Sequence, residues 1–95
     1  WNKYKTNMRE QLLTQSPYRL HPGKVDKKHL MLLINISSIR SNKVINALND
    51  YFVEGKKRKE ICEKHKINQG YLSIKINELQ ETSLKVYNIS YFILK

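Results

Sequence analysis

The sequence predicts a small all-α fold of about four to five helices that contains a helix-turn-helix motif. Apolar residues recur every three or four residues through most of the chain after residue 26, which is the period of an amphipathic helix. No Asn-Gly or Asp-Gly dipeptide signals a β-hairpin, and strict alternation is confined to Ser73–Asn77, inside a longer helical stripe. Leu, Ile, Val and Phe make up 27 of the 95 residues, which is enough for a small core.

The first 25 residues predict a basic N-terminal arm. They contain Pro17, Pro22 and Gly23, and the apolar residues of Met8–Leu13 suffice only for a short helix. Five cations in this segment are set against one acid, Glu10, which gives a net charge of +4. We expect the arm (residues 1–25) to be flexible or docked on a partner, and residues 26–95 to form the helical DNA-binding domain.

Apolar periodicity and capping residues predict the first two helices of that domain. Asp26 is the predicted N-cap of a helix over residues 27–36, and the serines at 37–38 interrupt its apolar pattern. Ser41 is the predicted N-cap of the second helix, and Gly55 suits the C′ position at its end.

The next two helices form the predicted helix-turn-helix, at about residues 57–81. The first of them runs from about 57 to 65, and the second from Asn68 to about Glu81. Residues 83–95 form an apolar C-terminal tail, predicted to be a last helix or an edge strand. An uncovered apolar tail implies docking on the core or on another subunit.

The charge is strongly positive and unevenly spread. The formal net charge is +10 at pH 7, and residues 56–66 alone carry +4. A polyanion is the natural partner of such a surface, because the release of condensed counterions drives association with nucleic acids. The alternative is that these lysines only solvate a small protein.

The composition excludes several classes of protein. Three glycines and one cysteine provide neither a glycine-rich phosphate loop nor a disulfide framework. No apolar run approaches the ~18–20 residues of a membrane span, and no signal-type region opens the chain. No paired carboxylates, nucleophile–base set or cofactor motif is visible, so we expect no enzyme and no cofactor. Cys62 and His65 lie three residues apart, but no second pair has ligand spacing, so we expect no metal site.

The apolar spacing after Cys62 is typical of a helix-turn-helix. The apolar positions that follow it, at intervals of 5, 10, 14 and 17 residues, are Ile67, Leu72, Ile76 and Leu79. In this motif a small residue lies where the second helix crosses the first, and apolar residues hold the second helix down. Cys62, Ile67, Leu72 and Ile76 are therefore the predicted structural residues, and Asn68 is the predicted N-cap.

With those residues inward, the second helix presents a mixed polar face. The predicted DNA-contacting residues on it are Gln69, Gly70, Tyr71, Ser73, Ile74, Lys75 and Asn77. Gln and Asn pair with adenine edges, Lys pairs with guanine or phosphate, and Ile contacts a thymine methyl group. Lys57, Arg58 and Lys59 are placed to hold the phosphate backbone. The alternative is a helical hairpin whose polar face is merely solvated.

An ordered series of short stretches carries a resemblance to a known family. They are Leu32-Leu33-Ile34, Ile36-Ser37-Ser38-Ile39, Ser41, Lys43-Val44-Ile45, Ala47-Leu48, Asp50-Tyr51, Val53, Arg58-Lys59-Glu60, Cys62-Glu63-Lys64, Gly70-Tyr71 and Ser73. From about Lys28 to Leu79 the chain resembles the PapB/FocB family of fimbrial (adhesin biosynthesis) transcription regulators. The resemblance implies an all-helical protein of enterobacteria that binds A/T-rich DNA upstream of fimbrial operons and adjusts phase-variable expression.

The resemblance also implies dimers and higher oligomers, and reading of thymine-rich repeats largely through the minor groove. The polar face of the second motif helix suggests the major groove instead, so both grooves stay open. Arg58 and Cys62 match positions that the family needs for DNA binding, which implies a phosphate or groove contact for Arg58 and a packing role for Cys62.

The chain departs from the family pattern at Lys57 and Leu72, and from helix-turn-helix motifs in general at Lys66. Lys57 stands where relatives usually have a capping serine, and Leu72 replaces a usual phenylalanine. Lys66 occupies the turn position where glycine is common, which lysine tolerates at some cost if its φ is positive. Before Lys27 and beyond Leu79 the resemblance is weak, so contacts made by the arm or the tail cannot be carried over.

We therefore expect a DNA-binding transcriptional regulator of fimbrial (adhesin) operons. It would bind A/T-rich double-stranded DNA as a homodimer and higher homo-oligomer, in the bacterial cytoplasm on the nucleoid. The alternative is a basic protein-interaction adaptor that lacks sequence-specific DNA binding. A peripheral membrane binder is disfavoured, because no helix combines a lysine face with a broad aromatic and apolar face.

Overall fold

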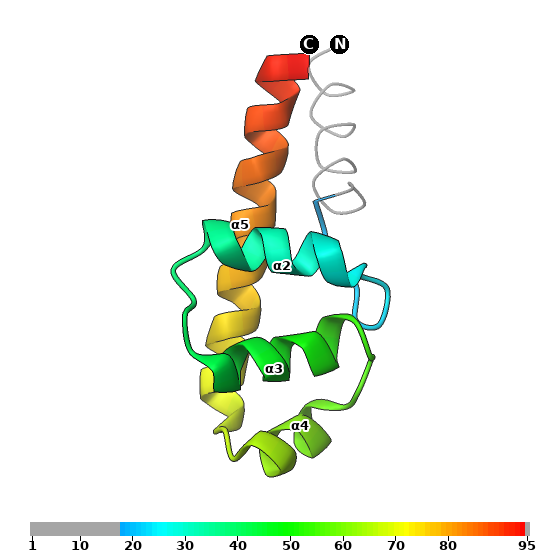
Figure 1. The fold of residues 1–95 in the computed structure, drawn as a ribbon, viewed down its shortest axis with the longest axis vertical. Coiled ribbons are helices and arrows are strands. Elements are labelled where there is room, and N and C mark those ends of the chain that lie inside the picture. Colours follow the sequence, from blue (N-terminus) through cyan, green and yellow to red (C-terminus); the bar gives the residue numbers. More distant parts are fainter. Residues whose placement is uncertain (1–17, 95) are drawn as a thin grey trace, which may run out of the picture.

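Four helices account for most of the residues that the computed structural model describes, which are residues 18–94 (Figure 1). Helix α2 spans Lys27–Ile36, α3 spans Asn42–Phe52, α4 spans Arg58–His65 and α5 spans Gln69–Leu94. The described residues form no strand. The all-α fold class predicted from the apolar periodicity is therefore confirmed, with four helices in this part of the chain.

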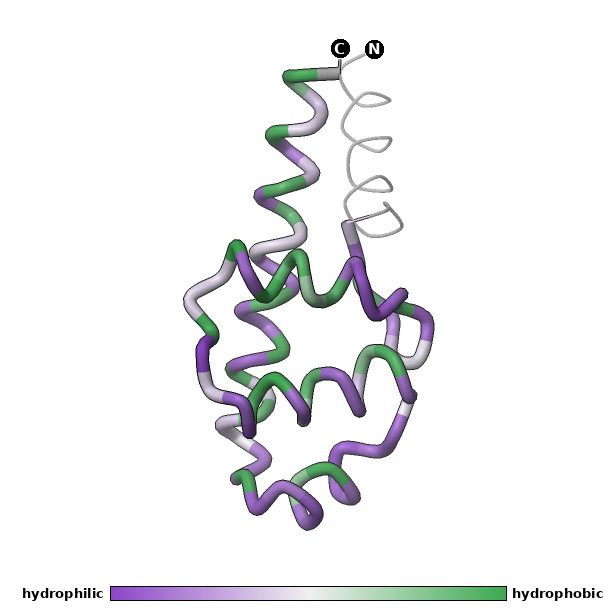
Figure 2. The backbone as a smooth tube through the Cα atoms, viewed as in Figure 1, coloured by the Kyte–Doolittle hydropathy of each residue, from purple (hydrophilic) through white to green (hydrophobic). Residues whose placement is uncertain are grey.

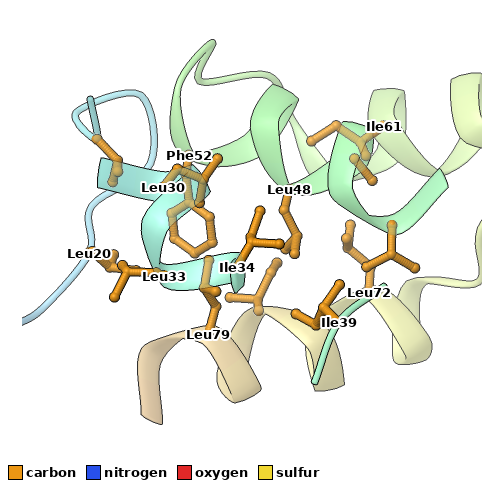
Figure 3. Packing of buried hydrophobic residues seen from close by; sticks show 14 of the residues in the cluster. Leu20, Leu30, Leu33, Ile34, Ile39, Leu48, Phe52, Ile61, Leu72 and Leu79 are labelled. Atoms are coloured by element: carbon orange, nitrogen blue, oxygen red, sulfur yellow. The ribbon is translucent and has the colours of Figure 1, made fainter. Parts of the chain in front are cut away.

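The first half of α5 is the common support of the other three helices. Helices α2, α3 and α4 each contact α5, and the upper half of α5 extends past them (Figure 1). Leu72, Ile76 and Leu79 repeat along one face of α5 at a helical interval and are all buried. Figure 3 shows Leu72 and Leu79 packed against Leu48 and Phe52 and their neighbours. Each such side chain stabilises the fold by about 1.5–3 kcal/mol through the apolar surface it removes from water.

The predicted N-caps of α2 and α3 are both present. The Asp26 carboxylate accepts the N–H groups of Lys28 and His29, and the Ser41 hydroxyl accepts that of Val44. These contacts satisfy backbone donors that have no partner within the helix. Lys57, which precedes α4, makes no such side-chain bond, as its replacement of a serine predicts.

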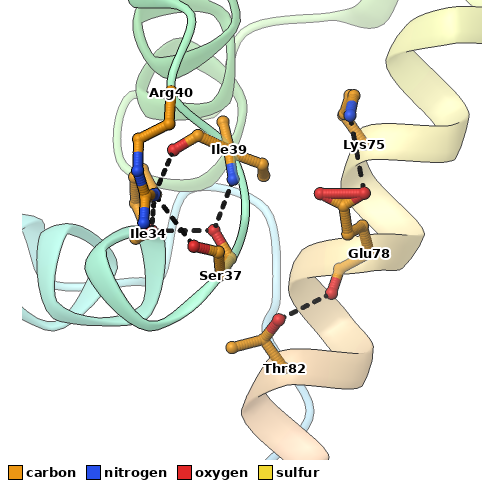
Figure 4. A network of polar contacts seen from close by, with 7 residues as sticks. All are labelled: Ile34, Ser37, Ile39, Arg40, Lys75, Glu78 and Thr82. Atoms are coloured by element: carbon orange, nitrogen blue, oxygen red, sulfur yellow. Dashed lines mark hydrogen bonds and ion pairs between the residues drawn. The ribbon is translucent and has the colours of Figure 1, made fainter.

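Side-chain hydrogen bonds, rather than a glycine, terminate helix α2. The Ser37 hydroxyl donates to the Ile34 carbonyl and accepts the N–H of Ile39. The Arg40 guanidinium donates to the carbonyls of Ile34, Ser37 and Ile39 (Figure 4). Arg40 therefore neutralises the negative end of the helix and redirects the chain toward α3.

The predicted end of the second helix is wrong by one residue. Helix α3 ends at Phe52 with Val53 as its C-cap, so Gly55 does not occupy the C′ position. Gly55 instead lies in the loop after the helix, with a positive φ of 73°. The loop turns back early because the N–H of Lys56 bonds the carbonyl of Asp50.

The predicted break after Glu81 is absent. Helix α5 continues from the motif through the apolar tail to Leu94, so residues 83–94 are neither a separate helix nor an edge strand. No Gly or Pro occurs beyond Gly70. Thr82 and Ser83, whose hydroxyls favour helix ends, are accommodated by bonds to the carbonyls of Glu78 and Tyr18.

The described part of the predicted arm, residues 18–25, packs on the helices. Leu20 and Val25 belong to the buried core. The backbone of Leu20 exchanges two hydrogen bonds with the side-chain amide of Gln80, at 3.0 and 2.8 Å. The flexible or partner-docked arm predicted for 1–25 is therefore wrong for this part, because its apolar residues find sites on the same chain. The short helix expected at Met8–Leu13 lies outside the described residues.

Two glycines allow this segment to pass close to the end of α3. Gly23 and Gly55 both have φ of 73°, and a Cβ atom on either would lie 3.1–3.2 Å from the Cα of the other. The contact brings the N–H groups of Gly23 and Val25 to the carbonyls of Tyr51 and Phe52. Any other residue would meet backbone atoms in a disfavoured conformation.

We predict that Gly55→Ala lowers the free energy of unfolding by about 1–3 kcal/mol, because alanine is disfavoured at positive φ and its methyl group would press on Gly23. Urea unfolding followed by circular dichroism measures the change. Asn46→Ala, at an exposed site of α3, is the control and should shift stability by less than about 0.5 kcal/mol. Equal stabilities of the two variants would contradict the prediction.

Candidate nucleic-acid interface

Helices α4 and α5 are joined by the three residues 66–68, as expected for the two helices of the motif. The four predicted structural residues of this pair, Cys62, Ile67, Leu72 and Ile76, are all buried. Asn68 caps α5 by accepting the N–H groups of Gly70 and Tyr71 with its side-chain oxygen. Packing and capping together hold the start of α5 against the end of α4.

Lys66 forms the turn itself. It has φ of 56° and ψ of 51°, the left-handed conformation that the sequence analysis considered for this position. Its backbone N–H and that of Ile67 both bond the carbonyl of Cys62. These bonds close the end of α4 and compensate for the conformational cost of a non-glycine residue.

Most of the predicted DNA-contacting residues are exposed on this helix pair. They are Lys57, Arg58, Lys59, Gln69, Gly70, Tyr71, Ile74 and Asn77. Ile74 is 61% exposed although it is apolar. The other two, Ser73 and Lys75, are only half-buried, because each contacts a neighbouring side chain. Figure 2 shows hydrophilic residues concentrated along α4 and the loop before it.

Arg58 joins three helices at the surface. Its Nη1 donates to the Ser73 hydroxyl of α5 at 2.6 Å, and its Nη2 lies 3.4 Å from the Tyr51 hydroxyl of α3. Its guanidinium carbon lies 5.3 Å from the centre of the Tyr51 ring, within reach of a cation–π contact. The side chain is therefore positioned while it remains exposed. Sequence reasoning selected Arg58 and Ser73 but gave no sign that they touch.

Lys75 is held on the side of α5. Its ammonium lies 3.5 Å from a Glu78 carboxylate oxygen, shown in Figure 4, and 5.4 Å from the centre of the Tyr71 ring. An exposed pair of this kind contributes little to stability. It does reduce the positive charge that Lys75 offers to a ligand.

A buried carboxylate anchors the other end of α4. Asp50 is only 7% exposed. Its carboxylate oxygens lie 2.7 Å from His65 Nε2, 3.4 Å from Lys64 Nζ and 3.9 Å from Lys56 Nζ. Burial raises the pKa of Asp50, but the His65 hydrogen bond and the two ammonium charges together lower that pKa below its ordinary value. Sequence reasoning missed this cluster, because Asp50 gave no signal beyond its place in a family-like stretch.

The described residues form neither a metal site nor a membrane-spanning helix. No group of three His, Cys, Asp or Glu side chains among residues 18–94 is close enough to hold a metal ion. None of the described helices is both long and apolar enough to cross a membrane.

Known proteins match nearly the whole chain. The family of adhesin biosynthesis transcription regulatory proteins matches residues 3–93. The regulatory protein FanB of Escherichia coli is 67% identical over 89 residues, which cover 94% of this chain and 90% of FanB. The pilus-subunit operon regulatory protein PapB of E. coli is 44% identical over 78 residues, which cover 82% of this chain and 68% of PapB. The crystal structure of E. coli FocB matches with a TM-score of 0.73 at 35% identity, covering 90% of this chain and 97% of FocB.

We predict that Asp50→Asn lowers the free energy of unfolding by roughly 1–3 kcal/mol at pH 7, because the buried oxygen loses its charge while its cationic partners remain. A depressed pKa stabilises the fold above the unfolded value of about 4, and this stabilisation is lost as the pH falls through the folded value. The deficit of the variant should therefore shrink below about pH 4.

Urea unfolding at several pH values measures both effects. Asp26→Asn is the matched control, because asparagine caps a helix about as well as aspartate does. A deficit for Asp50→Asn that persists unchanged at low pH would contradict the role of the charge.

Proposed function

The chain belongs to the family of adhesin biosynthesis transcription regulatory proteins, and from that premise we propose that this regulator acts by binding A/T-rich duplex DNA as an oligomer. Its named relatives regulate pilus and adhesin operons, and they are regulatory proteins rather than enzymes. The proposal extends their role to a fimbrial operon of this protein's own host, and it places the chain in the cytoplasm on the nucleoid.

The bond between Arg58 and Ser73 is the observation that carries the DNA-binding proposal. It joins the cationic start of α4 to the polar face of α5, so that the two halves of the predicted contact set form one surface. Arg58 uses two of its five N–H donors on Ser73 and Tyr51. The remaining donors are free to bind a phosphate or a base edge, and the guanidinium is already positioned for that contact.

Charge on this surface favours a nucleic acid over an acidic protein patch as the partner. Lys57 and Lys59 flank Arg58, are exposed, and have no ion-pair partner among residues 18–94. Three adjacent cations at a helix start can contact consecutive phosphates of one strand.

The face of α5 supplies the preference for A/T-rich sites. Gln69 and Asn77 offer amides that pair with adenine, and Ile74 offers an apolar contact for a thymine methyl group. These contacts lie in the major groove. The Arg58 guanidinium suits the narrow minor groove of A-tracts, whose negative potential attracts arginine. A duplex can therefore engage α5 and Arg58 through neighbouring grooves.

The end of α5 supports self-association. Ile89, Phe92 and Ile93 share one helical face and are 57%, 77% and 73% exposed. Residues 82–95 carry only two charges, Lys85 and Lys95, so two copies can approach with little repulsion. An exposed apolar helical face with polar residues on its flanks, here Asn88 and Ser90, is typical of a protein–protein interface.

The direct test compares an A/T-rich duplex with spaced thymine runs and a G/C-rich duplex by fluorescence anisotropy over a salt series. We expect tighter, stepwise binding to the A/T-rich duplex that weakens steeply with salt. Equal and weak binding to both duplexes would reject the proposal and favour the adaptor alternative.

Arg58→Ala should weaken binding to both duplexes and flatten the slope of log affinity against log salt by about one unit, because one phosphate contact is lost. Arg58→Lys is the matched control: it keeps the charge, so the slope should remain while the bonds to Ser73 and Tyr51 are lost. An unchanged slope in Arg58→Ala would remove this residue from the phosphate contacts.

Phe92→Asp should dissociate the oligomer, because a carboxylate cannot be buried unpaired in an apolar interface. Sedimentation equilibrium should give a multiple of 11.3 kDa for the wild type and 11.3 kDa for the variant. Asn46→Asp adds the same charge at an exposed site of α3, away from this face, and should leave the mass unchanged. A wild-type mass of 11.3 kDa at high concentration would contradict the assembly.

A further inference from the structure

A hollow of about 490 Å³ lies between the start of α3 and the turn that joins α4 to α5. Figure 1 shows these two segments at the same end of the molecule. The residues that line the hollow are Ser41, Lys43, Val44, Lys66, Ile67, Asn68 and Tyr71. No acidic residue lines it, and sequence reasoning assigned none of the α3 residues to a contact surface.

The two lysines of the hollow have no charged partner, unlike two other lysines of the described residues. The side chains of Lys43 and Lys66 are exposed and make no hydrogen bond or ion pair within residues 18–94. Lys56 and Lys64, in contrast, are paired with Asp50. The hollow therefore holds two full positive charges with no internal counterion.

The floor of the hollow strengthens their attraction for an anion. Val44 and Ile67 are buried apolar residues at its base. Apolar material beneath a charge lowers the effective dielectric constant and raises the energy of an ion pair formed above it. Ser41 binds the N–H of Val44, and Asn68 binds the N–H groups of Gly70 and Tyr71. The lysines are the charged groups that line the hollow and remain to bind a ligand.

The backbone of Lys66 is a separate sign that its side chain has a function. Its φ of 56° is a conformation that glycine adopts freely and that disfavours a side chain. A lysine held at such a position lowers stability relative to the better-suited residue, and residues of this kind cluster at binding sites.

Tyr71 connects the hollow to the surface proposed to bind DNA. It forms one wall of the hollow and also belongs to the exposed face of α5. A duplex lying on that face passes directly over the hollow, and the Tyr71 hydroxyl can donate a hydrogen bond to the same strand.

We propose that Lys43 and Lys66 together hold one backbone phosphate of the bound duplex in this hollow. The proposal rests on DNA binding and adds α3 to the DNA-contacting elements. The ligand is a phosphodiester of duplex DNA rather than a free nucleotide, because the hollow is open and no buried polar side chain in it could pair with a base. The contact positions the protein on the backbone and carries no sequence preference of its own.

The test measures fluorescence anisotropy on the A/T-rich and G/C-rich duplexes over a salt series for the double variant Lys43→Gln/Lys66→Gly. We expect roughly tenfold weaker binding to both duplexes and a salt slope that is flatter by about one unit, since one phosphate contact is lost. Because both lysines share that phosphate, the slope should not fall by two units.

Thermal unfolding excludes a folding defect as the cause. Lys66→Gly by itself should keep or raise the midpoint of unfolding, since glycine suits the left-handed turn. Lys28→Gln, which removes an exposed charge at the start of α2, is the matched control and should leave the slope unchanged.

Three outcomes would overturn the inference. An unchanged slope in the double variant, with a wild type that binds, removes the hollow from the DNA contacts and leaves DNA binding itself intact. An equal loss in Lys28→Gln attributes the effect to total charge. A wild type that binds neither duplex rejects DNA binding and this inference together.

Discussion

The buried stripe of Leu72, Ile76 and Leu79 on α5 is the constraint on which the rest of the structure depends. Helices α2, α3 and α4 each pack against α5, whose buried residues lie in its first half, and α3 also packs against α2 and α4. One face of α5 is therefore committed to the core. The opposite face, in the same turns of helix, is left to the solvent and to a ligand.

Two polar contacts then set the position of α4 on that support. At its end, the buried Asp50 carboxylate holds Lys64 and His65. At its start, Arg58 reaches Ser73 and Tyr51. The first contact neutralises cations and contributes to stability, whereas the second leaves most of the guanidinium exposed. The positive charge counted from the sequence thus divides into a structural part and a part that can attract DNA.

Local features were predictable because their causes lie within a few residues. The caps at Asp26, Ser41 and Asn68 follow from the hydrogen bonding of short polar side chains. Features that depend on distant segments were missed. The Ser83 hydroxyl in the middle of α5 donates to the carbonyl of Tyr18, 65 residues away along the chain.

The sequence by itself determined the all-α class, the extents of α2 and α4, the buried residues of the motif and the family, because periodicity, capping and motif spacing are properties of neighbouring residues. Only the tertiary structure decided that residues 18–25 join the core, that Arg58 meets Ser73, and that Lys43 and Lys66 line the same hollow. These are contacts between segments brought together by folding. Their energies depend on distance and burial in three dimensions, which no local pattern encodes.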